Sequence, residues 1–121
     1  MLSVANIVVA AIAILHVGIL VVEMFFWDKP LGKKIFGSAI RSKEFAAQTK
    51  VMAANQGLYN GFLAAGLFWG LMLGPDGNPV KYFFLMCVLV AGVYGAVSVD
   101  KKIHFVQTIP AAIGIALIYF S

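Results

Sequence analysis

Four long apolar runs, at about residues 2–27, 48–73, 80–98 and 103–120, constrain this chain more than any other feature. Each run reaches or approaches the ~20 residues that an α-helix needs to cross the ~30 Å hydrocarbon layer of a bilayer. None alternates with a period of two, and backbone groups that face lipid must be hydrogen-bonded within their own segment. The runs therefore predict an all-α fold, an integral membrane four-helix bundle.

The composition supports the same class. Of the 121 residues, 62% are hydrophobic and 12% are charged, whereas soluble domains have about 25% charged residues. Four spans occupy most of the chain, so we expect a single transmembrane domain over residues 1–121. The net charge of +4 does not indicate a nucleic-acid partner, because the basic residues cluster in loops without interleaved aromatic residues.

The basic residues also predict the orientation. Eight of the nine lie in the loops that follow the first and third runs, and only Lys81 lies on the other side. Cytoplasmic loops carry an excess of Lys and Arg. We therefore expect a multi-pass protein of the cell inner membrane with both termini outside. The first residues carry no Lys or Arg, which favours an uncleaved first span over a signal peptide.

The first basic loop has a helical pattern of its own. Apolar residues fall on one side of a helix, at Leu31, Ile35, Phe36, Ala39 and Ile40, and Lys33, Lys34, Ser38 and Arg41 fall on the other. This pattern is typical of a short amphipathic helix that lies at the membrane interface. A polar loop with incidental apolar residues is the alternative.

Two ionisable side chains, His16 and Glu23, interrupt the first apolar run. Such groups cost roughly 2 kcal/mol or more at membrane depth, so they rarely occur there without a partner or a function. They are seven residues apart, which places them on one face of a helix with an axial separation of roughly 10 Å.

Polar residues of the other spans fall in the halves expected to lie near the cytoplasm. The candidates are Asn55, Gln56, Tyr59, Asn60, Tyr94 and Gln107. The opposite halves, at 61–73, 80–91 and 111–120, carry almost no hydrogen-bonding side chains beyond Trp69, Tyr82 and Tyr119. We therefore predict a polar pocket open to the cytoplasm, in which these six residues, His16 and Glu23 bind a small molecule.

Alternatives to a ligand site remain open. Amides in membrane bundles often only bond neighbouring helices, and small residues at Ala53, Gly57 and Gly61 are typical of close helix packing within one chain or in a homodimer. A metal site is disfavoured, because His16, Glu23 and His104 lack the spacing that places two ligands on adjacent turns.

Three strings resemble a bacterial family of small four-helix integral membrane proteins catalogued only as a domain of unknown function. They are His16-x6-Glu23-Met24-Phe25-x-Trp27, Asn55-Gln56-Gly57-x-Tyr59-Asn60 and Val106-Gln107-x-x-Pro110. The resemblance implies four helices and a site at Glu23, Asn55, Gln56, Asn60 and Gln107, and His16 matches as well. In size and span count the family is distantly similar to the DoxX-like membrane proteins, which points to redox or quinone association.

The preferred function is binding or transport of a small molecule. A membrane-embedded enzyme that acts on a lipid-like or quinone-like substrate is the alternative, with His16 and Glu23 as acid and base. A structural or assembly subunit is a further alternative. The sequence identifies neither the ligand nor a cofactor, and it leaves open whether the protein is an enzyme.

Overall fold

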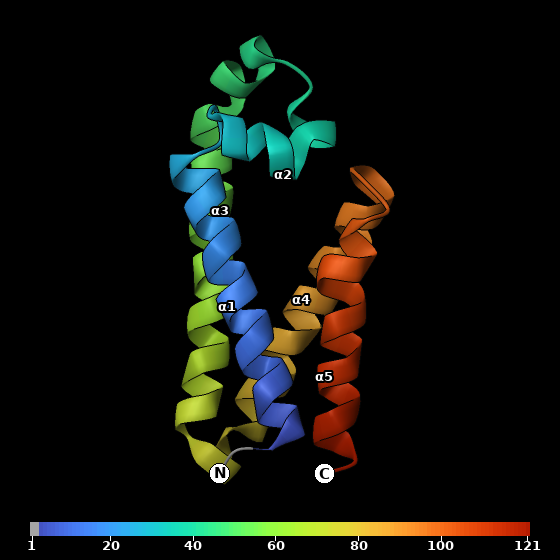
Figure 1. The fold of residues 1–121 in the computed structure, drawn as a ribbon. Helices are drawn as coiled ribbons and strands as arrows, with labels where there is room; N and C mark the ends of the chain where they lie inside the picture. Colours follow the sequence, from blue (N-terminus) through green and yellow to red (C-terminus); the bar gives the residue numbers. More distant parts are fainter. Residues whose placement is uncertain (1–2) are drawn as a thin grey trace. The chain divides into compact units, whose positions relative to one another are not determined.

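The computed structural model describes residues 3–121, which are almost entirely helical (Figure 1). The α-helices are α1 (Val4–Phe25), α2 (Pro30–Ile40), α3 (Lys43–Met72), α4 (Asn78–Ser98) and α5 (Ile109–Tyr119). A 3-10 turn, η1 (Gly74–Gly77), precedes α4, and a π-helical turn, η2 (His104–Thr108), precedes α5. No strand occurs in this part of the chain, so the predicted all-α class is confirmed.

Within residues 3–121, two helical segments are long and apolar enough to cross a membrane. They are α1, with 22 residues, and the continuous stretch Gly74–Ser98, with 25 residues. The stretch His104–Tyr119 is apolar but shorter, and α3 has the length but not the apolar composition. The four-span bundle with both termini outside stays a prediction.

The chain divides into two compact units. The terminal unit comprises the chain up to Ile14 and Leu63–Ser121, and the central unit comprises Leu15–Phe62. Both boundaries fall inside helices, α1 and α3. The expectation of a single domain over residues 1–121 stays a prediction.

The terminal unit has an apolar core that includes Val9, Ile12, Leu67, Leu85 and Val88. In this unit α4 and α5 lie side by side (Figure 1). Glycines allow close helix contacts, because an added Cβ at Gly114 would lie 3.3 Å from Leu85 Cδ1. Gly114 therefore serves helix packing within the terminal unit. Whether the small residues at Ala53, Gly57 and Gly61 also form a homodimer interface stays a prediction.

The last predicted span, 103–120, is not one regular α-helix. The backbone N–H of Ile109 donates to the His104 carbonyl, which closes the wider turn of a π-helix. The regular helix α5 begins only at Ile109, with Pro110 in its first turn. Because Pro lacks an N–H, it fits the first turn of a helix better than the interior.

The central unit is held together around Trp27, which lies between α1 and α2. Its indole Nε1 donates to Thr49 Oγ1 at 3.0 Å, and its ring lies 5.6 Å from that of Phe36. Trp27, Ile40, Ala46 and Ala53 form a small buried core. This core joins the connection between α1 and α2 to α2 and α3.

The short helix predicted after the first span is present as α2. Ile40 is buried and Phe36 and Ala39 pack against the Trp27 core, whereas Lys33 and Lys34 are exposed. Part of the apolar side therefore packs within the central unit. The location of α2 at a membrane interface stays a prediction.

Candidate functional site

Glu23 and Asn60 form a buried hydrogen bond in the central unit. Glu23 lies in the last turn of α1 and Asn60 in α3, and their exposed fractions are 7% and 9%. Asn60 Nδ2 donates to Glu23 Oε1 at 2.6 Å and also approaches the Gln56 carbonyl at 3.2 Å. The amide thus links a carboxylate to the backbone of its own helix.

Gly57 explains how α1 and α3 come close enough for this bond. A Cβ added at Gly57 would lie 2.8 Å from Met24 Cγ, 3.1 Å from Glu23 Cβ and 3.1 Å from the Leu20 carbonyl oxygen. Gly57 and Asn60 are three residues apart, and residues with that spacing share a helix face. The missing side chain at Gly57 therefore brings the Asn60 amide within reach of Glu23.

His16 is also buried in the central unit. Its exposed fraction is 0%, the lowest of the buried polar residues of α1, α3 and α4. It lies two turns before Glu23 on the same helix, at an axial distance of roughly 10 Å. This separation is too long for a direct hydrogen bond between the two side chains.

Three other predicted site residues of α3 are exposed. Asn55 Nδ2 donates to the Val51 carbonyl at 2.9 Å, one turn back along its own helix. Gln56 is exposed, and Tyr59 is 57% exposed with its ring 6.1 Å from that of Phe62. The structure therefore joins Asn60, and not Asn55 or Tyr59, to the carboxylate.

The remaining two candidates belong to the terminal unit. Tyr94 is exposed on α4, and Gln107 is half-buried in η2. Among the eight predicted residues, the Asn60 side chain bonds to the Glu23 carboxylate and to the Gln56 carbonyl. A site formed by all eight stays a prediction.

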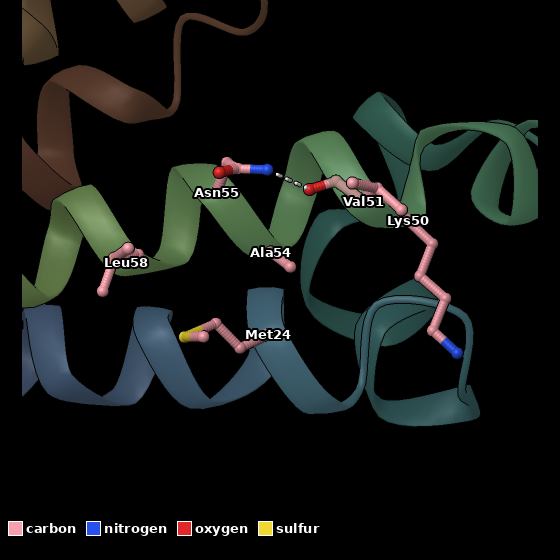
Figure 2. Close-up of a pocket in the computed structure, with 6 residues that line it drawn as sticks. All are labelled: Met24, Lys50, Val51, Ala54, Asn55 and Leu58. Atoms are coloured by element: carbon pink, nitrogen blue, oxygen red, sulfur yellow. Dashed lines mark hydrogen bonds between the residues drawn. The ribbon is translucent and has the colours of Figure 1, made fainter.

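A shallow groove of about 290 Å³ lies along α1 and α3 in the central unit (Figure 2). Its lining comes from both helices: Met24, Lys50, Val51, Ala54, Asn55 and Leu58. Figure 2 shows Leu58 and Ala54 on the side of α3 that faces α1, whereas the Asn55 side chain points away from α1. The groove is therefore mostly apolar, and Met24 is the chain neighbour of Glu23.

An ion pair closes one end of this region. Lys50 Nζ lies 3.2 Å from Asp28 Oδ2. The hydrogen bond from Lys50 holds the pKa of the Asp28 carboxyl below its usual value. The cation that lines the groove thus already has an acidic partner.

Sequence reasoning missed a polar cluster in the terminal unit. Lys81 is buried in the first turn of α4 and contacts Asn6 and Asn78, although the halves at 80–91 were expected to be nearly free of hydrogen-bonding groups. The sequence does contain a pattern that predicts this cluster, because Asn78 and Lys81 are spaced i, i+3 at the start of an apolar run and so share a helix face.

No metal-binding group is evident among residues 3–121, where no cluster of three or more His, Cys, Asp or Glu side chains is found. Cys87 is a half-buried free thiol. The residues described thus leave the carboxylate–amide contact as the main polar feature of the central unit.

These features define an all-α protein with two helices able to cross a membrane and a buried carboxylate–amide contact between α1 and α3. A family model described as "Protein of unknown function (DUF1304)" matches residues 10–119. The chain therefore belongs to the DUF1304 family, in agreement with the resemblance to an uncharacterised family. No curated protein and no solved structure matches the chain.

Proposed function

We propose that this chain is a four-span protein of the inner membrane that binds or transports a small molecule at the Glu23 carboxylate. The length and composition of α1 and of Gly74–Ser98 support the membrane location. The small molecule would enter from the cytoplasmic side, to which the positive-inside rule assigns the loops rich in Lys and Arg.

The observation that carries the proposal is the environment of Glu23. Glu23 is 7% exposed, and its carboxylate accepts a hydrogen bond from Asn60, which is a neutral donor. Lys50, a cation of the same unit, pairs with Asp28 instead. A buried carboxylate is costly unless it gains a proton or a cationic partner. A ligand with an ammonium or another strong donor group would supply that partner.

The groove beside Met24 supports the same proposal. Its volume of about 290 Å³ is close to the lower limit of roughly 300 Å³ for small-molecule sites. The apolar lining suits a ligand with a small hydrocarbon part. Glu23 is not among the lining residues, so a ligand that binds both requires the carboxylate to turn toward the groove. We therefore expect a small amphiphilic cation rather than a sugar or a nucleotide.

Native mass spectrometry of the protein from nanodiscs tests this proposal. We expect the wild type to retain a non-lipid molecule that is lost in Glu23→Gln, which keeps the shape of the side chain but cannot carry charge. Glu44→Gln is the matched control, because Glu44 is exposed in the first turn of α3. A wild type that carries only lipid, or equal retention by Glu23→Gln, contradicts the proposal.

Proteoliposomes separate transport from binding. With a pH-sensitive dye inside the vesicles, a transporter that exchanges its ligand for protons changes the internal pH when the copurified molecule is added outside. We expect Glu23→Gln to abolish this response and Glu44→Gln to preserve it. Binding without any flux would assign the protein as a binding protein.

A structural role is the second candidate, and specific contacts favour it. The Asn55 amide bonds to the backbone of its own helix, and the Asn60 amide bonds to Glu23 and to the Gln56 carbonyl. Such contacts are typical of polar residues that only hold helices together. This candidate predicts that Glu23→Gln changes stability but removes no bound molecule.

A further inference from the structure

A buried lysine at the start of α4 lies outside the site proposed above. Lys81 belongs to the terminal unit and is 3% exposed. Its Nζ donates to Asn6 Oδ1 at 2.9 Å and lies 3.4 Å from Asn78 Oδ1. The ammonium group is thus held between α1 and α4.

The partners of Lys81 do not balance its charge. Both acceptors are neutral amide oxygens, and no carboxylate in the part of the chain from Ser3 onward forms an ion pair with Lys81. An ammonium group has three N–H donors, and the two amide oxygens account for two of them. A buried charge without a counter-charge is costly, so such residues inside membrane segments usually indicate a binding site.

A pocket of about 280 Å³ opens beside the ammonium group. Its polar lining comprises Ser3, Asn6, Asn78, Lys81 and Ser121, and Ile118 contributes an apolar wall. Ser3 Oγ accepts a hydrogen bond from the Asn6 backbone N–H at 3.1 Å, which leaves its own O–H available as a donor. Cation, hydroxyl and amide groups therefore line one cavity.

The packing of α3 indicates that this space is built into the fold. A Cβ added at Gly70 would lie 2.8 Å from Lys81 Cγ and 3.2 Å from Lys81 N. Gly77 packs directly on the Gly70 carbonyl. Gly70 thus makes room for the aliphatic stem of a lysine that does not extend into solvent, and Gly77 lets the chain approach the Gly70 backbone.

We propose that this pocket binds the phosphate group of an anionic ligand, with Lys81 as its cationic partner. A phosphate oxygen supplies the negative charge and the acceptor that the third N–H of Lys81 needs. The first turn of α4 adds a weak positive potential, since helix N-termini favour anions. The phosphate belongs either to a lipid headgroup or to a soluble compound.

The first of these possibilities, that the phosphate belongs to a lipid headgroup, rests on the proposed membrane location. Lys81 is the fourth residue of α4, Asn6 is the third residue of α1, and Ile118 is the last but one residue of α5. If these helices span the bilayer, their ends lie near the level of the lipid phosphates. Acyl chains would then follow the apolar surface beside Ile118.

Lipid selectivity in nanodiscs tests whether the bound phosphate belongs to a lipid headgroup. In mixed phosphatidylglycerol and phosphatidylcholine nanodiscs, we expect native mass spectrometry to detect phosphatidylglycerol retained by the wild type and by Lys81→Arg. Retention should fall at least about tenfold in Lys81→Met, as expected for loss of a charge-assisted hydrogen bond. Lys102→Met is the matched control, because Lys102 is exposed.

Equilibrium dialysis of the detergent-solubilised protein with radiolabelled inorganic phosphate tests whether the bound phosphate belongs to a soluble compound. Phosphate binding that depends on Lys81, without lipid selectivity, would assign a soluble ligand. If neither phosphatidylglycerol nor phosphate binds, or if Lys81→Met binds both as the wild type does, the proposal is wrong.

A second variant keeps Lys81 in place. Ser3→Asp puts a carboxylate into the pocket and preserves the cap on α1, since Asp caps helices as well as Ser does. We expect this variant to be folded and to lose anion binding, because the new carboxylate pairs with Lys81. Unchanged anion binding by a folded Ser3→Asp protein would overturn the proposal. Lys81→Met and Ser3→Asp both leave Glu23 unchanged. The results with these two variants are therefore independent of the site in the central unit.

Discussion

The Glu23–Asn60 contact makes a prediction about single residues. Asn60→Leu removes the donor and leaves the carboxylate buried, so we expect a loss of stability of about 1–3 kcal/mol. Asn55→Leu is the matched control, because Asn55 is exposed and bonds only to its own helix, and its effect should stay within about 0.5 kcal/mol. Unfolding in mixed detergent micelles measures both.

A double-mutant cycle gives this prediction a second test. We expect Glu23→Leu combined with Asn60→Leu to cost less than the sum of the single changes, because no group is left without a partner. Strictly additive effects would show that Glu23 and Asn60 do not interact.

The Asp28–Lys50 ion pair predicts a dependence on pH outside the apolar segments. The pKa of Asp28 is lowered in the folded state, chiefly by its hydrogen bond to Lys50. A lowered pKa means that the stabilisation is present above the usual pKa of about 4 and is lost as the pH falls through the folded value. NMR titration of labelled aspartate should show a higher Asp28 pKa in Lys50→Met, and no change in Lys43→Met.

The sequence could identify which residues were unusual but not which way each one faced. His16 and Glu23 were recognised because ionisable groups are rare in apolar runs, and both are buried. In α3 the polar residues cover a wide arc, so composition alone does not define the side that meets α1. Gly57 does define it, because only a residue without a side chain fits against Leu20 and Met24.

At the scale of helices, Gly57 leads to a sharp prediction. Gly57→Ala places a Cβ within 3.1 Å of the Leu20 carbonyl oxygen, and backbone atoms cannot rotate away, so we expect a loss of roughly 1–3 kcal/mol. Gly18→Ala is the control, since nothing lies within 4 Å of an added Cβ there, and it should stabilise α1 by about 0.5–1 kcal/mol. Equal effects of the two changes in the same unfolding assay would contradict the close α1–α3 approach.

Helix boundaries were predicted best where a strong signal marks them. The segment Gly74–Gly77 separates α3 from α4, as its Gly and Pro content indicates. The start of α3 was predicted at about residue 48 but lies at Lys43, because Ser42 Oγ accepts a hydrogen bond from the Phe45 backbone N–H and caps the helix. A polar first turn hides such a start from a search for apolar runs.

At the scale of the whole molecule, the charges predict how the chain is inserted. All eight Lys and Arg residues outside α4 are exposed, and Lys81, the ninth, is buried. In a Cys87→Ser background, an impermeant maleimide should therefore label Asp76→Cys in intact cells, and label Lys34→Cys only after the membrane is permeabilised. Both sites are exposed. The reverse pattern would place both termini in the cytoplasm.

The surroundings of Trp27 have a practical consequence. The chain has two tryptophans, of which Trp69 is 54% exposed and Trp27 only 9%. A Trp69→Phe protein therefore keeps a single indole, shielded from water and bonded to Thr49. Its fluorescence reports on the junction of α1, α2 and α3 alone, so the protein carries its own optical probe for watching that junction when a ligand is added.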